Sequence, residues 1–226
     1  MSLRTLLALY AMPVLAAVAV ASHGADAPTT EGLVSVRSSS FDELYVRPDT
    51  DLARYRSVMI DPVQVSFRPD WNHDFVDPHA SVRRLTQDDV RRIADDTAAG
   101  LQSALSEAFT ARGYSLATAP GPGVLRVSPI LTNVYVNAVE DLYGGGTTKS
   151  FTKDAGEATL SLDARDAATG ALLGRIVDRR TASQTKGTQR GDLIRSPLVT
   201  SNFWFEDLFR KWSVACVKEL GGAKLS

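Results

Sequence analysis

The sequence predicts an α+β fold, a two-layer sandwich in which two amphipathic helices pack on a mostly antiparallel sheet of about five strands. Three observations support this prediction. Two long segments place apolar residues at helical spacing, and several shorter segments alternate apolar and polar residues. Consecutive strand-like segments are joined by short turns, which favours antiparallel pairing. Two amphipathic helices also need an apolar surface to cover, and one face of a sheet provides it.

Length and composition indicate an ordinary globular protein. The chain has 226 residues, of which 44% are hydrophobic, and a net charge of -1. A chain of this length can bury one sizeable core. Proteins dedicated to nucleic-acid binding usually have a strongly basic surface, so we expect no nucleic-acid partner.

The N-terminus has the layout of a secretory signal peptide. Arg4 precedes an apolar run from Leu6 to Val20, and the run ends in the cleavage-site pattern Ala19-Val20-Ala21. This run is 15 residues long, whereas a membrane-spanning helix needs about 20. An uncleaved membrane anchor is the alternative interpretation.

We therefore expect a signal peptide over residues 1–21, a flexible leader over 22–40 and a single α+β domain over 41–222. After cleavage at Ala21 the mature chain would be periplasmic or secreted, with no transmembrane segment. The only cysteine is Cys216, so no intramolecular disulfide can form.

The first predicted strand covers residues 55–67. Its apolar residues change phase at Asp61-Pro62, where a proline without a backbone N–H fits a bulge. A second strand, over residues 125–138, has a similar interruption at Ser128-Pro129. Beyond it we expect a new inward-facing set: Ile130, Thr132, Val134 and Val136. Two strands with the same bend are expected to be neighbours in one sheet.

A long helix is predicted between these two strands. Thr86 is the expected N-cap, with Asp88 and Asp89 in the first turn, and Gly113 is the expected stop. One apolar stripe follows helical spacing: Val90, Ile93, Ala94, Thr97, Leu101, Ala104, Leu105, Ala108 and Phe109. Gly100 lies inside the helix, where glycine costs about 1 kcal/mol relative to alanine, so a close packing contact is expected there.

A short strand is expected near Tyr114, and the side chain of Tyr114 is expected to contact Phe109. A hairpin is predicted over residues 156–182, with its turn from Asp166 to Gly170.

The closing helix is predicted over residues 201–222. Its apolar face contains Phe205, Leu208, Phe209, Trp212, Cys216 and Leu220. A smaller apolar set lies to one side of that face: Phe203, Val214 and Val217. This set either contacts a partner or lies under the loop at 186–200.

The stretch DLYGGGTTKS, residues 141–150, resembles a phosphate-binding loop only superficially. Such a loop requires glycine before the lysine and a helix after it. Here Thr148 precedes Lys149, and the residues that follow are strand-like. We interpret the stretch as a connection between two antiparallel strands, and a nucleotide titration would test this interpretation.

No metal, cofactor or catalytic residue is assigned. Residues 70–79 contain potential metal ligands, but their spacing matches no known motif and a solvated loop is the favoured interpretation. These residues are Asp70, His73, Asp74, Asp77 and His79. Cys216 lies on the apolar face of a helix and is interpreted as a small buried side chain. A pair of catalytic carboxylates for glycosidic cleavage is a further possibility, because the fold and not the sequence spacing brings such a pair together.

A basic stretch over residues 175–195 is the candidate anion-binding site. It consists of Arg175, Arg179, Arg180, Lys186, Arg190 and Arg195. Lipid head groups or a cell-wall polymer would be suitable ligands. In a regular strand Arg179 and Arg180 point to opposite faces of the sheet, which argues against a single patch.

Residues 41–71 and 156–180 resemble domain-of-unknown-function family 3313 of bacterial envelope proteins. The resemblance extends from Gly32 to Leu220. Many members of that family look like lipoproteins, whereas this chain has no cysteine after the apolar run to bear a lipid. The family has no assigned catalytic residues, so the resemblance implies none. The element order is also similar to that of envelope accessory lipoproteins that serve curli secretion or activate peptidoglycan synthases.

These observations favour a non-catalytic accessory or binding protein of the cell envelope, whose partner is an envelope protein or a cell-wall polymer. One alternative is an envelope hydrolase or carbohydrate-active enzyme with dispersed carboxylates. The other is an anionic polymer or lipid binder that uses the basic stretch over residues 175–195.

Overall fold

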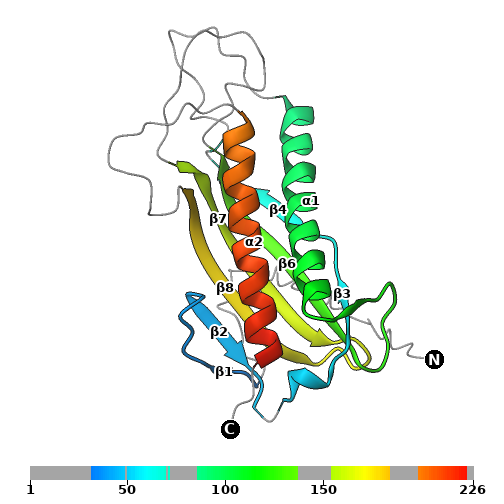
Figure 1. Ribbon diagram of the computed structural model, residues 1–226. Coiled ribbons are helices and arrows are strands. Elements are labelled where there is room, and N and C mark those ends of the chain that lie inside the picture. Colours follow the sequence, from blue (N-terminus) through cyan, green and yellow to red (C-terminus); the bar gives the residue numbers. More distant parts are fainter. Residues whose placement is uncertain are drawn as a thin grey trace, which may run out of the picture.

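The computed structural model describes residues 32–48, 50–69, 71, 86–136, 154–183 and 198–222. Within these residues the chain forms one large sheet, a short 3-10 helix and two long α-helices (Figure 1). The elements are β1 (Val34–Ser35), β2 (Glu43–Val46), η1 (Leu52–Arg54), β3 (Ser57–Ile60), β4 (Gln64–Phe67), α1 (Gln87–Ala111), β5 (Ser115–Leu116), β6 (Val124–Val136), β7 (Asp154–Asp166), β8 (Leu172–Ser183) and α2 (Leu198–Gly222).

The sheet has eight strands in the order β1-β2-β8-β7-β6-β3-β5, and β4 pairs with β6 beside β3. The predicted α+β class and the mostly antiparallel pairing are confirmed. The expected count of about five strands is too low, because β1 and β2 were not predicted and residues 55–67 form two strands. The pairs that β6 makes with β3 and β4 are parallel, as is the pair between β3 and β5.

The interruption predicted at Asp61-Pro62 is confirmed, since β3 ends at Ile60 and β4 begins at Gln64. Both strands pair with β6, so the two predicted strand segments are neighbours in the sheet as expected. Pro62 therefore lies outside the ladder, where its missing backbone N–H leaves no strand pair incomplete.

The interruption predicted in β6 is wrong. This strand runs unbroken through Ser128-Pro129, and Pro129 is buried while Ile130 is 36% exposed. The register shifts instead between Thr132 and Tyr135, around Asn133, whose φ is 51°. Pro129 falls between the residues of β6 that pair with β3 and those that pair with β4. A missing donor is tolerated at that position, so the strand does not need to break there.

The start and end of α1 follow the local sequence. Thr86 Oγ1 accepts a hydrogen bond from Asp89 N at 3.2 Å, and Thr86 N donates to Asp89 Oδ2 at 3.0 Å, which together form a capping box. Gly113 follows the helix with a φ of 89°. The ring of Tyr114 meets that of Phe109 edge-on, with centroids 5.3 Å apart. The predicted N-cap, the predicted stop and the predicted contact between Tyr114 and Phe109 are confirmed.

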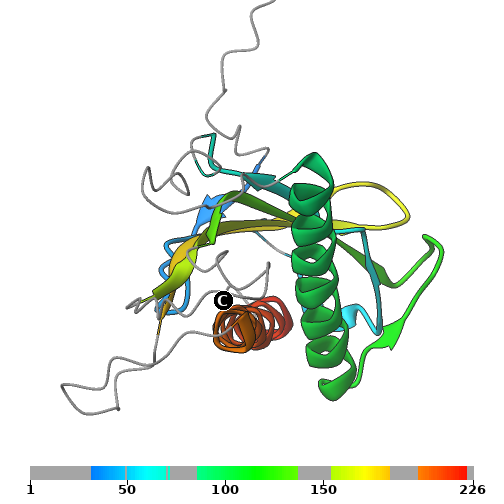
Figure 2. The same ribbon diagram turned by 90° about the horizontal axis from the view of Figure 1, so that it is seen from above.

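Both helices cover the same face of the sheet, and both run from the top to the bottom of Figure 1. Figure 2, in which α1 is seen side-on and α2 end-on, shows that they cross each other. Alternate residues of the central strands meet them: Leu125, Val127 and Leu131 of β6, Leu160 and Leu162 of β7, and Ile176 of β8. The helices supply Leu101, Leu105, Phe109, Phe209 and Trp212 to this core. Every residue on the predicted apolar face of α2 is buried. Neither described helix is both long enough and apolar enough to cross a bilayer.

Candidate functional site

Two of the predicted anion-binding arginines lie on the sheet face that the helices leave open. Arg175 donates from Nε and Nη2 to the two carboxylate oxygens of Asp163, at 2.6 and 2.8 Å. Arg165 bonds to the same carboxylate at 3.0 Å. Arg179 donates to both oxygens of Glu157, each at 2.9 Å. An incoming anion would have to compete with these carboxylates.

The carboxyl group of Asp163 is held in its ionised form. Partial burial opposes ionisation, but the hydrogen bonds and positive charges of Arg175 and Arg165 outweigh it and lower the pKa of Asp163. The ion pairs that Asp163 makes with Arg175 and Arg165 are therefore intact at neutral pH.

Arg180 points to the helix side of the sheet, so the expected divergence from Arg179 is confirmed. Its Nε donates to Asp178 Oδ2 at 2.6 Å. The same oxygen accepts from Trp212 Nε1 at 2.6 Å, and Asp178 Oδ1 accepts from Asp42 N at 3.0 Å. Asp178 is only 3% exposed. Arg180 thus belongs to a buried network that connects β8 to α2.

Several predicted features lie outside the described residues. These are the signal peptide, the glycine-rich stretch 141–150, the potential metal ligands between Asp70 and His79, and the basic residues Lys186, Arg190 and Arg195. No group of potential metal ligands is found within the described ranges. Cys216 is fully buried, as expected, and burial raises the pKa of its thiol.

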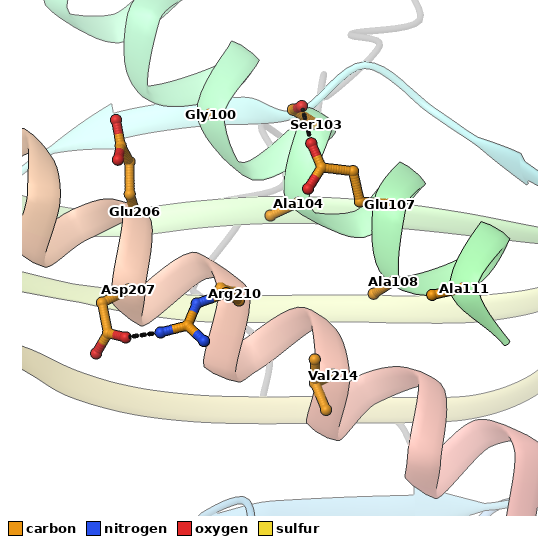
Figure 3. Close-up of a pocket in the computed structure, with 10 residues that line it drawn as sticks. All are labelled: Gly100, Ser103, Ala104, Glu107, Ala108, Ala111, Glu206, Asp207, Arg210 and Val214. Atoms are coloured by element: carbon orange, nitrogen blue, oxygen red, sulfur yellow. Dashed lines mark hydrogen bonds and ion pairs between the residues drawn. The ribbon is translucent and has the colours of Figure 1, made fainter.

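A groove of about 550 Å³ lies between α1 and α2 on the side away from the sheet (Figure 3). Its α1 wall consists mainly of small side chains: Gly100, Ser103, Ala104, Ala108 and Ala111, with Glu107 among them. Its α2 wall consists of Glu206, Asp207, Arg210 and Val214. A ligand in this groove would meet small or apolar groups flanked by charged ones.

The charges around the groove are mainly negative. Glu107 accepts a hydrogen bond from Ser103 at 2.9 Å, and Asp207 is paired with Arg210 and Lys211. The hydrogen bond from Lys211 is the largest influence that lowers the pKa of Asp207. Glu206 is exposed and has no ion-pair partner within the described part of the chain. Three carboxylates therefore surround the groove together with a single arginine.

Among the residues that line the groove, only Val214 was considered from the sequence as a possible partner contact. Val214 is 58% exposed in the groove, whereas Val217 from the same predicted set is 2% exposed and belongs to the core. The side chain of Phe203 lies outside the description. Ala104 and Ala108 were assigned to the apolar stripe of α1, and the fold places them at the edge of the core and in the groove. Helical spacing alone could not show whether these two side chains lie in the core or line a groove.

Comparison with solved structures shows only distant similarity. A PelC dodecamer from Paraburkholderia phytofirmans matches 80% of this chain and 98% of its own, with 10% identity and a TM-score of 0.37. Protein XCC0632 from Xanthomonas campestris matches 74% of this chain and 84% of its own, with 10% identity and a TM-score of 0.37. A neuraminyllactose-binding hemagglutinin homolog from Helicobacter pylori matches 77% of this chain and 89% of its own chain, with 12% identity and a TM-score of 0.35. Similarity this distant supports no functional argument.

Comparison with curated proteins finds no match. The model of a family described as "Protein of unknown function (DUF3313)" matches residues 29–196.

Proposed function

We propose, from the premise that this chain belongs to the DUF3313 family of proteins of unknown function, that it is a non-catalytic accessory protein of the cell envelope. In this proposal the groove between α1 and α2 binds a helical segment of another envelope protein. The expected signal peptide and the family resemblance support the envelope location. The groove supports the binding role.

The observation that carries the proposal is the groove between α1 and α2 and the residues that line it. Gly100, Ala104, Ala108 and Ala111 recur along one side of α1. Side chains this small let another helix approach closely, and a helix lying in a groove is a common mode of peptide recognition. The exposed side chain of Val214 provides an apolar contact on the opposite wall.

The charges around the groove indicate what kind of helix fits. Glu107, Glu206 and Asp207 are acidic, and Arg210 is the one basic residue of the lining. Complementary charges favour the correct partner and disfavour acidic ones. The expected partner segment is therefore an amphipathic helix with one apolar face and flanking lysine or arginine residues.

The carboxyl groups favour binding over hydrolysis. A glycosidase needs a general acid whose pKa is raised. The carboxyl groups with shifted pKa values in the described ranges, Asp163, Asp166 and Asp207, are all shifted downward. Asp61, Glu157 and Asp178 are each bonded to an arginine, as is Asp163. Carboxylates held in this way suit a structural role better than proton transfer.

Site-specific photo-cross-linking in intact cells would test the proposal. A photoreactive residue at position 214 lies in the groove, and a matched one at Thr181 lies on an exposed part of β8. We expect position 214, and not position 181, to cross-link to an envelope protein, and the linked peptide to be a basic amphipathic helix. Equal labelling from both positions, or a linked peptide without this character, would contradict the proposal.

A matched pair of substitutions would test the groove directly. Ala111→Trp places a large ring in the groove, whereas Ala99→Trp places one at an exposed position of α1 that does not line it. We expect Ala111→Trp to abolish the cross-link from position 214 and Ala99→Trp to preserve it. If the cross-link survives Ala111→Trp, the partner does not occupy the groove.

A further inference from the structure

A second pocket, separate from the groove, lies where the C-terminal ends of both helices meet η1. Figure 1 shows that α1 and α2 end at the same end of the molecule. The pocket measures about 150 Å³ and is lined by Ala53, Tyr55, Arg56, Arg112, Gly113, Tyr114 and Gly221. A water molecule occupies about 30 Å³ in the liquid, so this space can hold a tetrahedral or planar oxyanion together with some water.

The lining of this pocket is rich in hydrogen-bond donors. Arg56 and Arg112 contribute two guanidinium groups, and Tyr114 contributes a phenolic hydroxyl. Within the described residues none of these three polar groups has a hydrogen-bond or ion-pair partner, and no carboxylate belongs to the lining. Tyr55 differs, because its hydroxyl donates to Asp166 at 2.7 Å.

The ends of the helices do not neutralise the two arginines. Each helix C-terminus is equivalent to about half a negative charge, so the two together supply about one. Two guanidinium groups supply two positive charges, which leaves the pocket positive. Arg112 follows α1 directly, where a basic residue suits the helix dipole. Arg56 is outside both helices, so the dipole does not account for it.

The backbone holds both arginines in place. Arg56 N donates to Gly123 O at 3.3 Å, and Arg56 O accepts from Ser115 N at 3.0 Å. Arg112 N donates to Ala108 O at 3.2 Å and to Phe109 O at 3.1 Å. The two side chains therefore extend from fixed backbone positions at one small pocket, and little backbone ordering would be needed on binding.

We infer that this pocket binds an oxyanion, a phosphate or carboxylate group, between Arg56 and Arg112 with Tyr114 as a further donor. Guanidinium groups present paired donors that match the oxygens of such anions, and these charge-assisted bonds are stronger than neutral ones. Free phosphate and the phosphate of a lipid head group share this chemistry. Binding of either ligand at this pocket is independent of the partner proposed for the groove.

Two binding experiments on the full chain distinguish these sources. The first titrates inorganic phosphate by calorimetry, and the second measures flotation with phosphatidylglycerol vesicles against phosphatidylcholine vesicles. We expect saturable binding in at least one of them. Arg56→Gln and Arg112→Gln should each weaken it at least tenfold, and Tyr114→Phe should weaken it less. Arg91→Gln is the matched control, since Arg91 is exposed and lies beside Asp88 on α1, and it should leave binding unchanged.

Each possible outcome of these experiments either supports or overturns the inference. Binding of free phosphate that both arginine variants lose assigns the pocket to a soluble anion. Binding only to phosphatidylglycerol vesicles, with the same losses, assigns it to a lipid head group. The inference is overturned if neither probe binds, or if binding survives both substitutions. Thermal unfolding of the variants shows whether they remain folded, which we expect because both arginine side chains are exposed.

Discussion

Gly100 of α1 lies against the ring of Phe209 of α2, because a Cβ atom at position 100 would be 3.4 Å from both Cδ2 and Cε2 of that ring. This is the close contact that a glycine inside a helix predicts. One more carbon at position 100 just reaches ordinary van der Waals contact. A larger side chain would force the two helices apart.

Two substitutions at Gly100 should therefore have opposite effects. Gly100→Ala gains helix propensity and should stabilise the protein by up to about 1 kcal/mol. Gly100→Leu overpacks the contact with Phe209 and should cost about 1–3 kcal/mol. Urea unfolding of both variants checks this prediction. Equal stability of the two variants would show that the helices do not pack tightly at this point.

Gly156 of β7 should be the more sensitive of two glycines with positive φ. Its φ is 142°, and a Cβ there would lie 1.8 Å from Tyr135 O. Gly156→Ala must therefore separate β7 from β6 beside the irregularity of that pair, at a cost of about 3 kcal/mol or more.

Gly170 is the matched control for this substitution. It has a φ of 75° and open space around it, so Gly170→Ala should cost only the left-handed backbone penalty of about 1–2 kcal/mol. Denaturant unfolding of the two variants measures the difference. If Gly156→Ala lowers the free energy of unfolding no more than Gly170→Ala does, the backbones of β6 and β7 do not approach each other closely at this point.

Arg179 and Arg180 are adjacent in sequence but should differ in their effect on stability. Arg180 bonds to the buried carboxylate of Asp178, so Arg180→Gln leaves that charge with weaker compensation and should cost about 2 kcal/mol. The side chain of Arg179 is 65% exposed in its pair with Glu157, so Arg179→Gln should change stability by less than about 0.5 kcal/mol. Thermal and urea unfolding provide the comparison.

The same two variants address the predicted anion-binding stretch. If Arg179 contacts an anionic polymer, Arg179→Gln should weaken vesicle or polymer binding and leave stability almost unchanged. Raising the salt concentration should reduce the same binding. A loss of binding that merely follows the loss of stability across both variants would exclude a direct role for Arg179.

Asp166 should make stability depend on pH in the acid range. Tyr55 OH donates to Asp166, as do the backbone N–H groups of Thr169 and Ala168, and these bonds lower the pKa of Asp166 from 3.8 to about 2. Since the folded pKa is the lower one, the stabilisation is complete above about pH 4. It is lost as the pH falls to about 2.

Asp166→Asn isolates this effect, because its amide oxygen can still accept the backbone bonds of the turn while the charge is removed. The wild type should exceed the variant in stability by about 1 kcal/mol above pH 4, after allowance for screening. The difference should shrink toward pH 2. Unfolding measured between pH 2 and 6 checks it, and a constant difference across this range would contradict the assignment.

Local signals in the sequence predicted much of the fold. The N-cap at Thr86, the stop at Gly113 and the turn from Asp166 to Gly170 depend on residues close together in the chain, and all three are confirmed. The buried face of α2 was also predicted, since a period of 3.6 residues is repeated there without interruption. Such features need no knowledge of the rest of the molecule.

The errors occur where the sequence pattern fits more than one arrangement. In β6 apolar residues occupy both phases around Pro129, so a bulge at Ser128-Pro129 and one at Asn133 explained the pattern equally well. Pairing with β3, β4 and β7 decided between them. Strands β1 and β2 are too short to show a clear period, and β2 is recognisable as a strand only because it pairs with β8.

The sequence by itself determined the helices, the hairpin and the apolar faces of this protein, because caps, turns and hydrophobic periodicity act within a few residues. Only the tertiary structure decided which strands run parallel, that the two helices end together, and that small residues of α1 meet charged residues of α2 in a groove. Arg56 and Arg112 are 56 positions apart in the chain, and only the packing of η1 against α2 and of β3 against α1 places them at one pocket. Contacts between such distant segments depend on how the whole core packs, and no local pattern records them.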